Sequence, residues 1–99
     1  MIRHTVVFSL KHVAGSEEEM DFLSAGMRLG NISTVNNFEC LRQISTKNSY
    51  SFGFSMEFES EEDYEFYNNH EEHVDFVQNR WISEVVDFLE IDYEKCKIV

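Results

Sequence analysis

The chain has 99 residues, 42% hydrophobic and 14% aromatic, which suits one folded domain over residues 1–99. Nineteen acidic against eight basic residues give a formal net charge of −11, so nucleic acid and anionic membrane surfaces would be repelled. No apolar run is long enough to span a membrane and no leader pattern is present, which predicts a cytoplasmic protein that binds neither nucleic acid nor membrane. The acidity indicates either a solvated surface or a preference for cationic partners.

The first clear signal along the chain is an alternating stretch over residues 2–11. Apolar side chains and His4 fall on one side and mostly polar side chains on the other, and this period of two predicts a half-buried strand. Ser16 and the three glutamates after it are typical of a helix N-terminus, because the hydroxyl caps the first turn and the acids favour the positive end of the helix dipole. Gly30 and Asn31 predict the end of that helix.

Two further strands are predicted in the middle of the chain. Residues 36–45 have an extended pattern, and the turn-rich tetrad at 46–49 is of hairpin length. In residues 50–58, large apolar side chains alternate with small or polar ones, which is typical of a strand with one side against a core.

The C-terminal part is predicted to hold one interrupted helix and one strand. Ser60 and the acids after it indicate a second helix N-terminus. We expect that helix to pause at residues 68–70 and to resume as an amphipathic helix that includes Val85. Residues 88–97 alternate again and predict the last strand, with Cys96 on it.

The predicted order is strand, helix, strand, strand, helix, strand. This order predicts an α+β fold of the ferredoxin-like βαββαβ type, with a four-stranded antiparallel sheet in the order 4-1-3-2 and both helices on one face. The other face is then uncovered, and two such sheets packed face to face form a homodimer, a dimeric α/β barrel. Cys40 and Cys96 fall on opposite edge strands and are interpreted as free thiols. The uncovered face is expected to contain Thr5, Val7, Leu41, Ser51, Gly53 and Ser55.

Three segments resemble a known family, the stress-responsive A/B barrel (Dabb) domains. Residues 1–10 (MIRHTVVFSL) resemble the first strand of that family, and residues 58–62 (FESEE) with 67–74 (YNNHEEHV) resemble its F-E-S…Y-x-x-H-P-x-H stretch. The likeness covers the whole chain in order and length. The chain departs from the pattern at Glu71, where the family has Pro, although Glu also suits a helix N-terminus by its charge.

The resemblance implies a homodimeric α+β barrel in a family whose members mostly have no assigned activity. One member is a plant polyketide cyclase that closes a ring by an aldol step without metal or cofactor. The functional residues of that enzyme match His4, Tyr67 and His73 here, so these three are the candidate catalytic residues, with no cofactor and no metal expected.

The candidate residues suggest a cofactor-free proton transfer on a small apolar, phenolic or carbonyl compound. Burial and a helix N-terminus both disfavour imidazolium, so His73 is expected to be a neutral base. Tyr67 would then hold the carbonyl oxygen by a hydrogen bond as charge develops, and His4 would orient the base or anchor a substrate hydroxyl. The pocket between sheet and helices is predicted to be lined by Val6, Phe8, Phe22, Met56, His70 and Trp81.

Several alternatives remain at this level. The three polar residues are equally compatible with a non-catalytic homodimeric stress or scaffold protein whose pocket is filled by its own side chains. A barrel monooxygenase or haem degrader is a third reading, but the sequence offers no haem-ligating arrangement. A divalent-metal site is a further alternative, with His70 and His73 as ligands beside Glu71 and Glu72, although no third ligand follows at a recognisable spacing. His12 is expected to be solvated in a loop.

Overall fold

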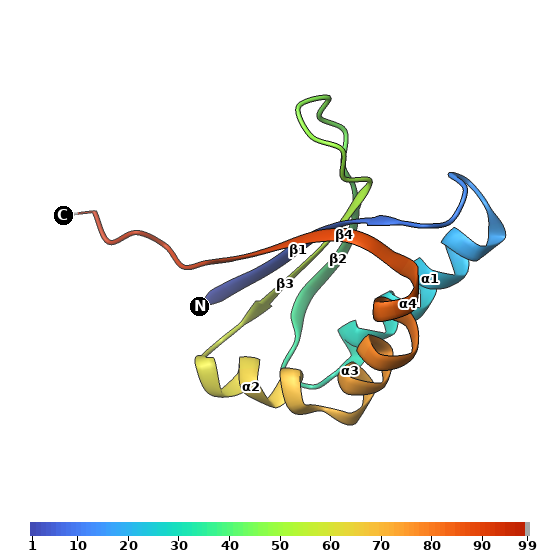
Figure 1. Cartoon of the computed structure of the whole chain (residues 1–99). Coiled ribbons are helices and arrows are strands. Elements are labelled where there is room, and N and C mark those ends of the chain that lie inside the picture. Colours follow the sequence, from blue (N-terminus) through green and yellow to red (C-terminus); the bar gives the residue numbers. More distant parts are fainter. Residues whose placement is uncertain (99) are drawn as a thin grey trace.

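A four-stranded antiparallel sheet forms one layer, and the helices pack on one of its faces (Figure 1). The computed structural model describes residues 1–98. The elements, in chain order, are β1 (Ile2–Leu10), α1 (Glu17–Met27), a short 3-10 helix η1 (Arg28–Asn31), β2 (Asn36–Arg42), β3 (Phe52–Phe58), α2 (Glu61–Asn69), α3 (Glu71–Phe76), a π-helical turn η2 (Val77–Trp81), α4 (Ile82–Glu84) and β4 (Val85–Tyr93).

The strand order β2-β3-β1-β4 confirms the predicted ferredoxin-like topology. Strand β1 is central, and it pairs antiparallel with β3 on one side and β4 on the other. In this register His4 lies opposite Met56 of β3 and Asp92 of β4. Because residues directly opposite each other on paired strands point to the same face, Met56 and Asp92 lie on the helix side of the sheet together with the buried His4.

Both predicted helix N-termini are confirmed by their caps. The Ser16 hydroxyl accepts a hydrogen bond from the amide of Glu19, and the Ser60 hydroxyl accepts one from the amide of Asp63, each at 3.2 Å. Such caps satisfy amides that have no partner within the helix. The expected pause is also present, because His70 has extended backbone angles between α2 and α3.

The predicted bounds of the last strand are wrong at both ends. Val85 begins β4 rather than continuing the helix, because its backbone pairs with Leu10 of β1 and tertiary pairing overrides helical spacing. The neighbouring amide of Lys11 donates to the carbonyl of Glu84 at 2.9 Å. Strand β4 ends at Tyr93, so Cys96 lies beyond it, in an exposed segment.

The connection between β2 and β3 is longer than the predicted tetrad and spans residues 43–51. Backbone pairing continues to Gln43, whose main-chain amide donates to the carbonyl of Ser51 at 2.9 Å. Beyond that bond side chains take part: the Gln43 side-chain amide donates to the carbonyl of Tyr50 at 2.7 Å, and Asn48 Oδ1 accepts from the amide of Tyr50 at 3.0 Å. Such local side-chain bonds offer the backbone an alternative to the sheet ladder, so β2 ends already at Arg42 and β3 begins only at Phe52.

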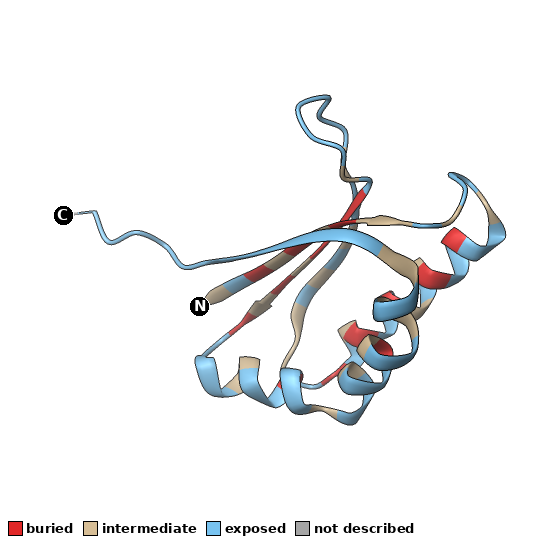
Figure 2. Ribbon diagram, in the orientation of Figure 1, coloured by how far each residue is buried: buried red, intermediate tan, exposed pale blue. Residues whose placement is uncertain are grey.

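Aromatic rings form most of the core, which lies between the sheet and the helices (Figure 2). Phe8 is fully buried, and its ring centroid lies 4.8–6.1 Å from those of Phe22, Phe52, Phe54 and Trp81. Strand β4 contrasts with β1 and β3, because it is exposed along almost its whole length (Figure 2). The helices therefore cover the centre of the sheet and leave its β4 edge open.

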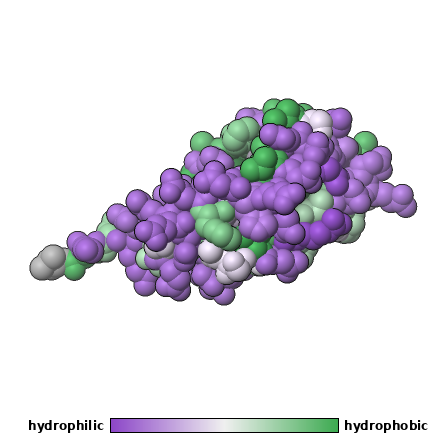
Figure 3. Space-filling view, turned by 90° about the horizontal axis from the view of Figure 1, so that it is seen from below, coloured by the Kyte–Doolittle hydropathy of each residue, from purple (hydrophilic) through white to green (hydrophobic). Residues whose placement is uncertain are grey.

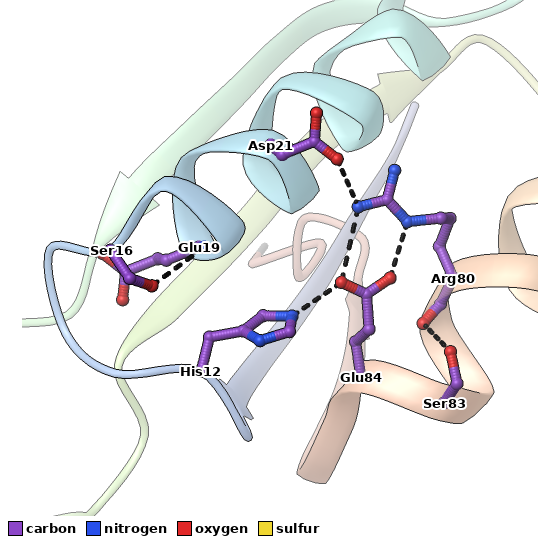
Figure 4. A network of polar contacts seen from close by, with 7 residues as sticks. All are labelled: His12, Ser16, Glu19, Asp21, Arg80, Ser83 and Glu84. Atoms are coloured by element: carbon purple, nitrogen blue, oxygen red, sulfur yellow. Dashed lines mark hydrogen bonds and ion pairs between the residues drawn. The ribbon is translucent and has the colours of Figure 1, made fainter.

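A polar network ties the end of β1 to α1 and to the π-helical turn (Figure 4). His12 Nε2 lies 2.6 Å from Glu84 Oε1, so the expectation that His12 is solvated is wrong. The Arg80 guanidinium donates to Glu84 and also to Asp21 of α1, at 2.6 and 2.8 Å. The amide of Ile82 donates to the carbonyl of Val77, and this π-type bond precedes the short α4.

The face of the sheet opposite the helices exposes large apolar side chains. Val7 pairs with Leu89 and Thr5 with Ile91, so these two apolar residues of β4 point away from the helices, whereas Phe88, opposite Phe8, points toward them. The surface seen from the helix side is in contrast mostly hydrophilic (Figure 3). The exposed apolar residues of the open sheet face include Leu41, Leu89, Ile91 and Tyr93.

Within residues 1–98, no helix combines the length and the apolar character that a membrane crossing needs.

The close approach of α1 to the sheet at Gly26 gives a stability prediction. A Cβ at Gly26 would lie 2.8 Å from Cε2 of Phe54, whose ring is itself packed against Phe8 and Phe38. We predict that Gly26→Ala lowers the free energy of unfolding by about 1–3 kcal/mol, since overpacking outweighs the gain in helix propensity. Urea unfolding measures this, with Ser24→Ala on the exposed side of α1 as the control. A Gly26→Ala variant as stable as the parent would contradict the close packing.

Candidate functional site

His4 is a buried polar side chain on the central strand. It is 5% exposed, and its Nδ1 lies 2.6 Å from Asp92 Oδ1 and 2.7 Å from the Tyr64 hydroxyl. The Tyr64 hydroxyl itself donates to Asp92 Oδ2 at 2.9 Å. A carboxylate accepts and does not donate, so Nδ1 of His4 bears a proton and donates it toward Asp92.

The Tyr64 hydroxyl is held in its protonated form by its surroundings. Burial is the largest cause that raises the pKa of Tyr64, followed by the hydrogen bond to Asp92 and the negative charges of Asp92 and Glu90. Its ring stacks on Phe58, with centroids 4.8 Å apart and planes 5° from parallel. Tyr64 is thus a rigid donor between α2 and β4.

Tyr67 follows Tyr64 by one helical turn and is only 2% exposed. No residue among 1–98 forms a hydrogen bond with its hydroxyl. In these residues, however, every side-chain oxygen or nitrogen that is sealed from solvent does have a hydrogen-bond partner. The hydroxyl therefore reaches a space that solvent can enter. Burial, and secondly the charge of Glu90, raise the pKa of Tyr67, so its hydroxyl remains a donor at neutral pH.

His73 stands beside Tyr67 on the next helix, with ring centroids 4.4 Å apart. Its Nδ1 lies 3.0 Å from the carbonyl oxygen of Asn68. A carbonyl only accepts, so Nδ1 is protonated and Nε2 is an unprotonated base. Burial is the main cause that lowers the pKa of His73 below its ordinary value; the charge of His4 acts in the same direction, whereas the Asn68 carbonyl and Glu90 oppose it.

The three candidate catalytic residues therefore lie together. The ring of Tyr67 is between the two histidines, 6.2 Å from His4 and 4.4 Å from His73 by ring centroids. Both imidazoles are held at Nδ1 and present Nε2. The arrangement combines two free ring nitrogens with one unpartnered phenol donor.

The six predicted lining residues lie at different depths. Trp81 lies in the helical layer and contacts Phe8 and Phe88, with ring centroids 5.1 and 5.5 Å apart. His70 Nδ1 accepts from the amide of Glu72 at 3.1 Å, so this ring caps α3. The other four are buried members of the core cluster: Val6, Phe8, Phe22 and Met56.

An open hollow of about 640 Å³ adjoins the histidine cluster at the β4 edge. Tyr64 and Asp92 belong to both, because they contact His4 and also line the hollow. Asn68, whose carbonyl holds His73, lines it as well. The remaining lining residues are Ile2, Glu61, Glu62, Glu65, Tyr93 and Glu94.

No group of three or more His, Cys, Asp or Glu side chains is arranged to hold a metal ion in the part of the chain that the structure describes. His70 and His73 each direct Nδ1 at the helix backbone, His70 as an acceptor and His73 as a donor. Proton transfer by the side chains is the chemistry that these residues supply directly.

Comparison with known proteins supplies the family. A family model for the stress responsive A/B barrel domain, Dabb, matches residues 2–95. The chain belongs to this family. A Dabb family protein with a ferredoxin-like fold from Mesorhizobium loti is 55% identical, with 97% of each chain covered and a TM-score of 0.94. No curated protein matches this chain significantly.

Two more distant solved structures share the Dabb fold of this chain. A dimeric protein of unknown function from Bacteroides fragilis is 21% identical over 95% of each chain, with a TM-score of 0.71. The hydroxynitrile lyase from Passiflora edulis is 12% identical, over 99% of this chain and 95% of that one, with a TM-score of 0.84. At these identities the likeness concerns the fold alone.

Sequence reasoning missed three residues at the candidate site. Tyr64 lies three positions before Tyr67, so the helical period would have placed both on one face. Asp92 and Glu90 gave no such signal, because only the register of β4 against β1 brings them to His4 and Val6.

The state of His73 gives a spectroscopic prediction. Nitrogen NMR of the ring at neutral pH is expected to show a proton on Nδ1 and none on Nε2, with a titration midpoint below the ordinary 6.5. Since the unfolded chain binds this proton at higher pH than the folded one, His73 reduces stability as pH falls from 6.5 to the folded midpoint. His73→Gln identifies the signal and removes that part of the pH dependence. A ring protonated on Nε2 would contradict the Asn68 contact.

Proposed function

We propose that this Dabb protein binds a small aromatic carbonyl or phenolic compound beside His4, Tyr67 and His73, and moves a proton on it without metal or cofactor. The observation that carries the proposal is the pair formed by Tyr67 and His73. One presents a buried hydroxyl with no partner within residues 1–98, and the other presents a free Nε2 whose opposite nitrogen is fixed. Donor and base with adjacent rings suit enolisation, isomerisation or aldol closure.

The surroundings of His73 and of Tyr67 suit the first to act as the base and the second as the hydrogen-bond donor. Nε2 of His73 accepts a proton from a carbon next to the carbonyl, and its lowered pKa keeps it unprotonated at neutral pH. The Tyr67 hydroxyl donates to the carbonyl oxygen as negative charge develops there. His4, fixed by Asp92 and Tyr64, anchors a substrate hydroxyl by a hydrogen bond through Nε2. Trp81 and the half-exposed Phe88 are suited to contact an apolar ring.

One observation favours the alternative of a non-catalytic homodimeric stress or scaffold protein. Val6, Phe8, Phe22 and Met56 fill the deep part of the predicted pocket with their own side chains. A ligand must then lie at the shallower end, near β4. The alternative predicts that aromatic ketones neither bind nor react, so the exchange experiment below separates the two functions.

The proton-transfer proposal is tested by hydrogen–deuterium exchange. Proton NMR in D₂O follows the methyl protons of acetophenone, and the protein is expected to accelerate their exchange. His73→Gln should slow that catalysed rate by about 100-fold or more, and Tyr67→Phe by about tenfold or more, because a general base and an oxyanion donor are lost. His12→Gln is the matched control, since His12 contacts Glu84 and takes no part in the site. A rate unchanged by His73→Gln would refute the assignment.

We also propose that the protein is a homodimer formed through the open sheet face. That face exposes Leu41, Leu89, Ile91 and Tyr93, and a second copy would cover them in a self-complementary contact. Light scattering should give twice the chain mass at micromolar concentration. Leu89→Asp should shift the protein to monomer, whereas Val13→Asp in an exposed loop should not. A parent chain that is monomeric at that concentration would rule out this arrangement.

A further inference from the structure

Two acids of β4 face the candidate site from the edge of the sheet. Asp92 lies opposite the buried His4, and Glu90 lies opposite the buried Val6. Because residues directly opposite each other on paired strands point to the same face, both carboxylates stand on the helix side of the sheet. Alternate residues of a strand are about 7 Å apart, so Glu90 lies next to Asp92 and diagonally across from His4.

The structure uses these two acids differently. Both oxygens of Asp92 accept hydrogen bonds, Oδ1 from Nδ1 of His4 at 2.6 Å and Oδ2 from the Tyr64 hydroxyl at 2.9 Å. Glu90, in contrast, is exposed and takes part in no ion pair within residues 1–98. Since an ionised carboxylate accepts and does not donate, Glu90 is the acid on this side of β4 that is open to an incoming donor.

The charge of Glu90 reaches both members of the proposed catalytic pair. It is the second cause, after burial, of the raised pKa of Tyr67, and it opposes the lowering of the pKa of His73. Tyr67 is also the independent sign of a ligand, since it is 2% exposed and its hydroxyl has no partner within residues 1–98. One donor, one base and one acceptor therefore lie around the same part of the site.

An aromatic surface adjoins Glu90 on its other side. Phe88 precedes Glu90 by two residues on the same face of β4, is 50% exposed, and has its ring centroid 5.5 Å from that of Trp81. A ligand ring that packs on Phe88 and Trp81 has Glu90 at its edge, where ring substituents project. A ring hydroxyl there would donate a charge-assisted hydrogen bond to the carboxylate.

We propose that Glu90 determines the substrate of this site by accepting a hydrogen bond from a hydroxyl on the aromatic ring of the substrate, while the acyl carbonyl on that ring lies at Tyr67 and His73. The assignment rests on the proposed function and adds its substrate class, the hydroxyaryl ketones. It also gives the two acids separate roles, because Asp92 fixes His4 and Glu90 selects the ligand.

Matched probes test the preference for a hydroxyl. They are meta- and para-hydroxyacetophenone, each compared with its methyl ether, which keeps the ketone and the ring oxygen but has no proton to donate. NMR titration of the parent protein should show at least one of the two phenols binding about tenfold tighter than its ether.

Variants test whether Glu90 is the acceptor. Glu90→Leu should bring the ratio of phenol to ether affinity close to one, and Glu90→Gln should restore part of it, because a neutral amide oxygen accepts a weaker hydrogen bond. The ratio is insensitive to a change that affects both ligands equally. Glu18→Gln removes the same charge from the first turn of α1 and should leave the ratio unchanged.

The place of Glu90 is tested without any ligand. Because its negative charge favours the protonated ring, Glu90→Gln should lower the titration midpoint of His73 further, as nitrogen NMR measures it. Glu18→Gln should leave that midpoint unchanged. A midpoint that is the same in Glu90→Gln and in the parent overturns the placement of Glu90 at the site.

The binding results separate the proposal from the proposed function. Phenols that bind no tighter than their ethers overturn the hydroxyl assignment, and a preference that survives in Glu90→Leu overturns the role of Glu90. A preference that depends on Glu90, found in a protein that does not catalyse methyl-proton exchange, refutes the proton transfer and supports the binding assignment. If the parent binds none of the four compounds, both fail together.

Discussion

The hydrogen bonding of His4 is the constraint on which the rest of the site depends. An imidazole buried at the centre of a sheet destabilises the fold by about 1–3 kcal/mol unless its nitrogen is satisfied. Asp92 and Tyr64 satisfy it from two other elements, β4 and α2, with contacts of 2.6 and 2.7 Å to one nitrogen. The same bonds fix where α2 stands over the sheet and hence where its next tyrosine, Tyr67, points. One buried ring thus joins three elements at the place where the candidate chemistry occurs.

The hydrogen bonds of the two histidines also determine which ring nitrogens carry protons. His4 and His73 are each held at Nδ1, one by a carboxylate and a phenol and the other by a backbone carbonyl. Nε2 of His73 therefore carries a lone pair rather than a proton, and the unpartnered hydroxyl beside it is that of Tyr67. This division matches a reaction in which a substrate gives up a proton and receives a hydrogen bond on oxygen. The negative charge of Glu90 opposes the neutral state of His73, because it favours the protonated ring.

Much of this architecture could be predicted from sequence, because its signals are local. The alternation in β1 and β3 and the serine caps depend on neighbouring residues alone, and the structure confirms them. The start of β4 could not be predicted, since Val85 continues the helical spacing and only pairing with Leu10 makes it a strand. The place of Asp92 beside His4 could not be predicted either, because it too depends on the pairing of β4 with β1. Leu89 and Ile91 of β4 face away from the helices, so Asp92, which pattern alone assigns to solvent, comes to lie beside the buried His4.

The π-helical turn at Val77–Trp81 also has a bearing on how this chain can vary. A π turn holds about one residue more than an α turn, so it shifts the angular phase of everything after it by roughly 100°. In this chain that phase directs Glu84 at His12 and Arg80 and delivers Val85 to the end of β1. Deleting a single residue here would leave every side chain of the sheet unaltered and still misdirect the strand that carries Asp92. Chain length in this segment is therefore as much a determinant of the site as the identity of any residue in it.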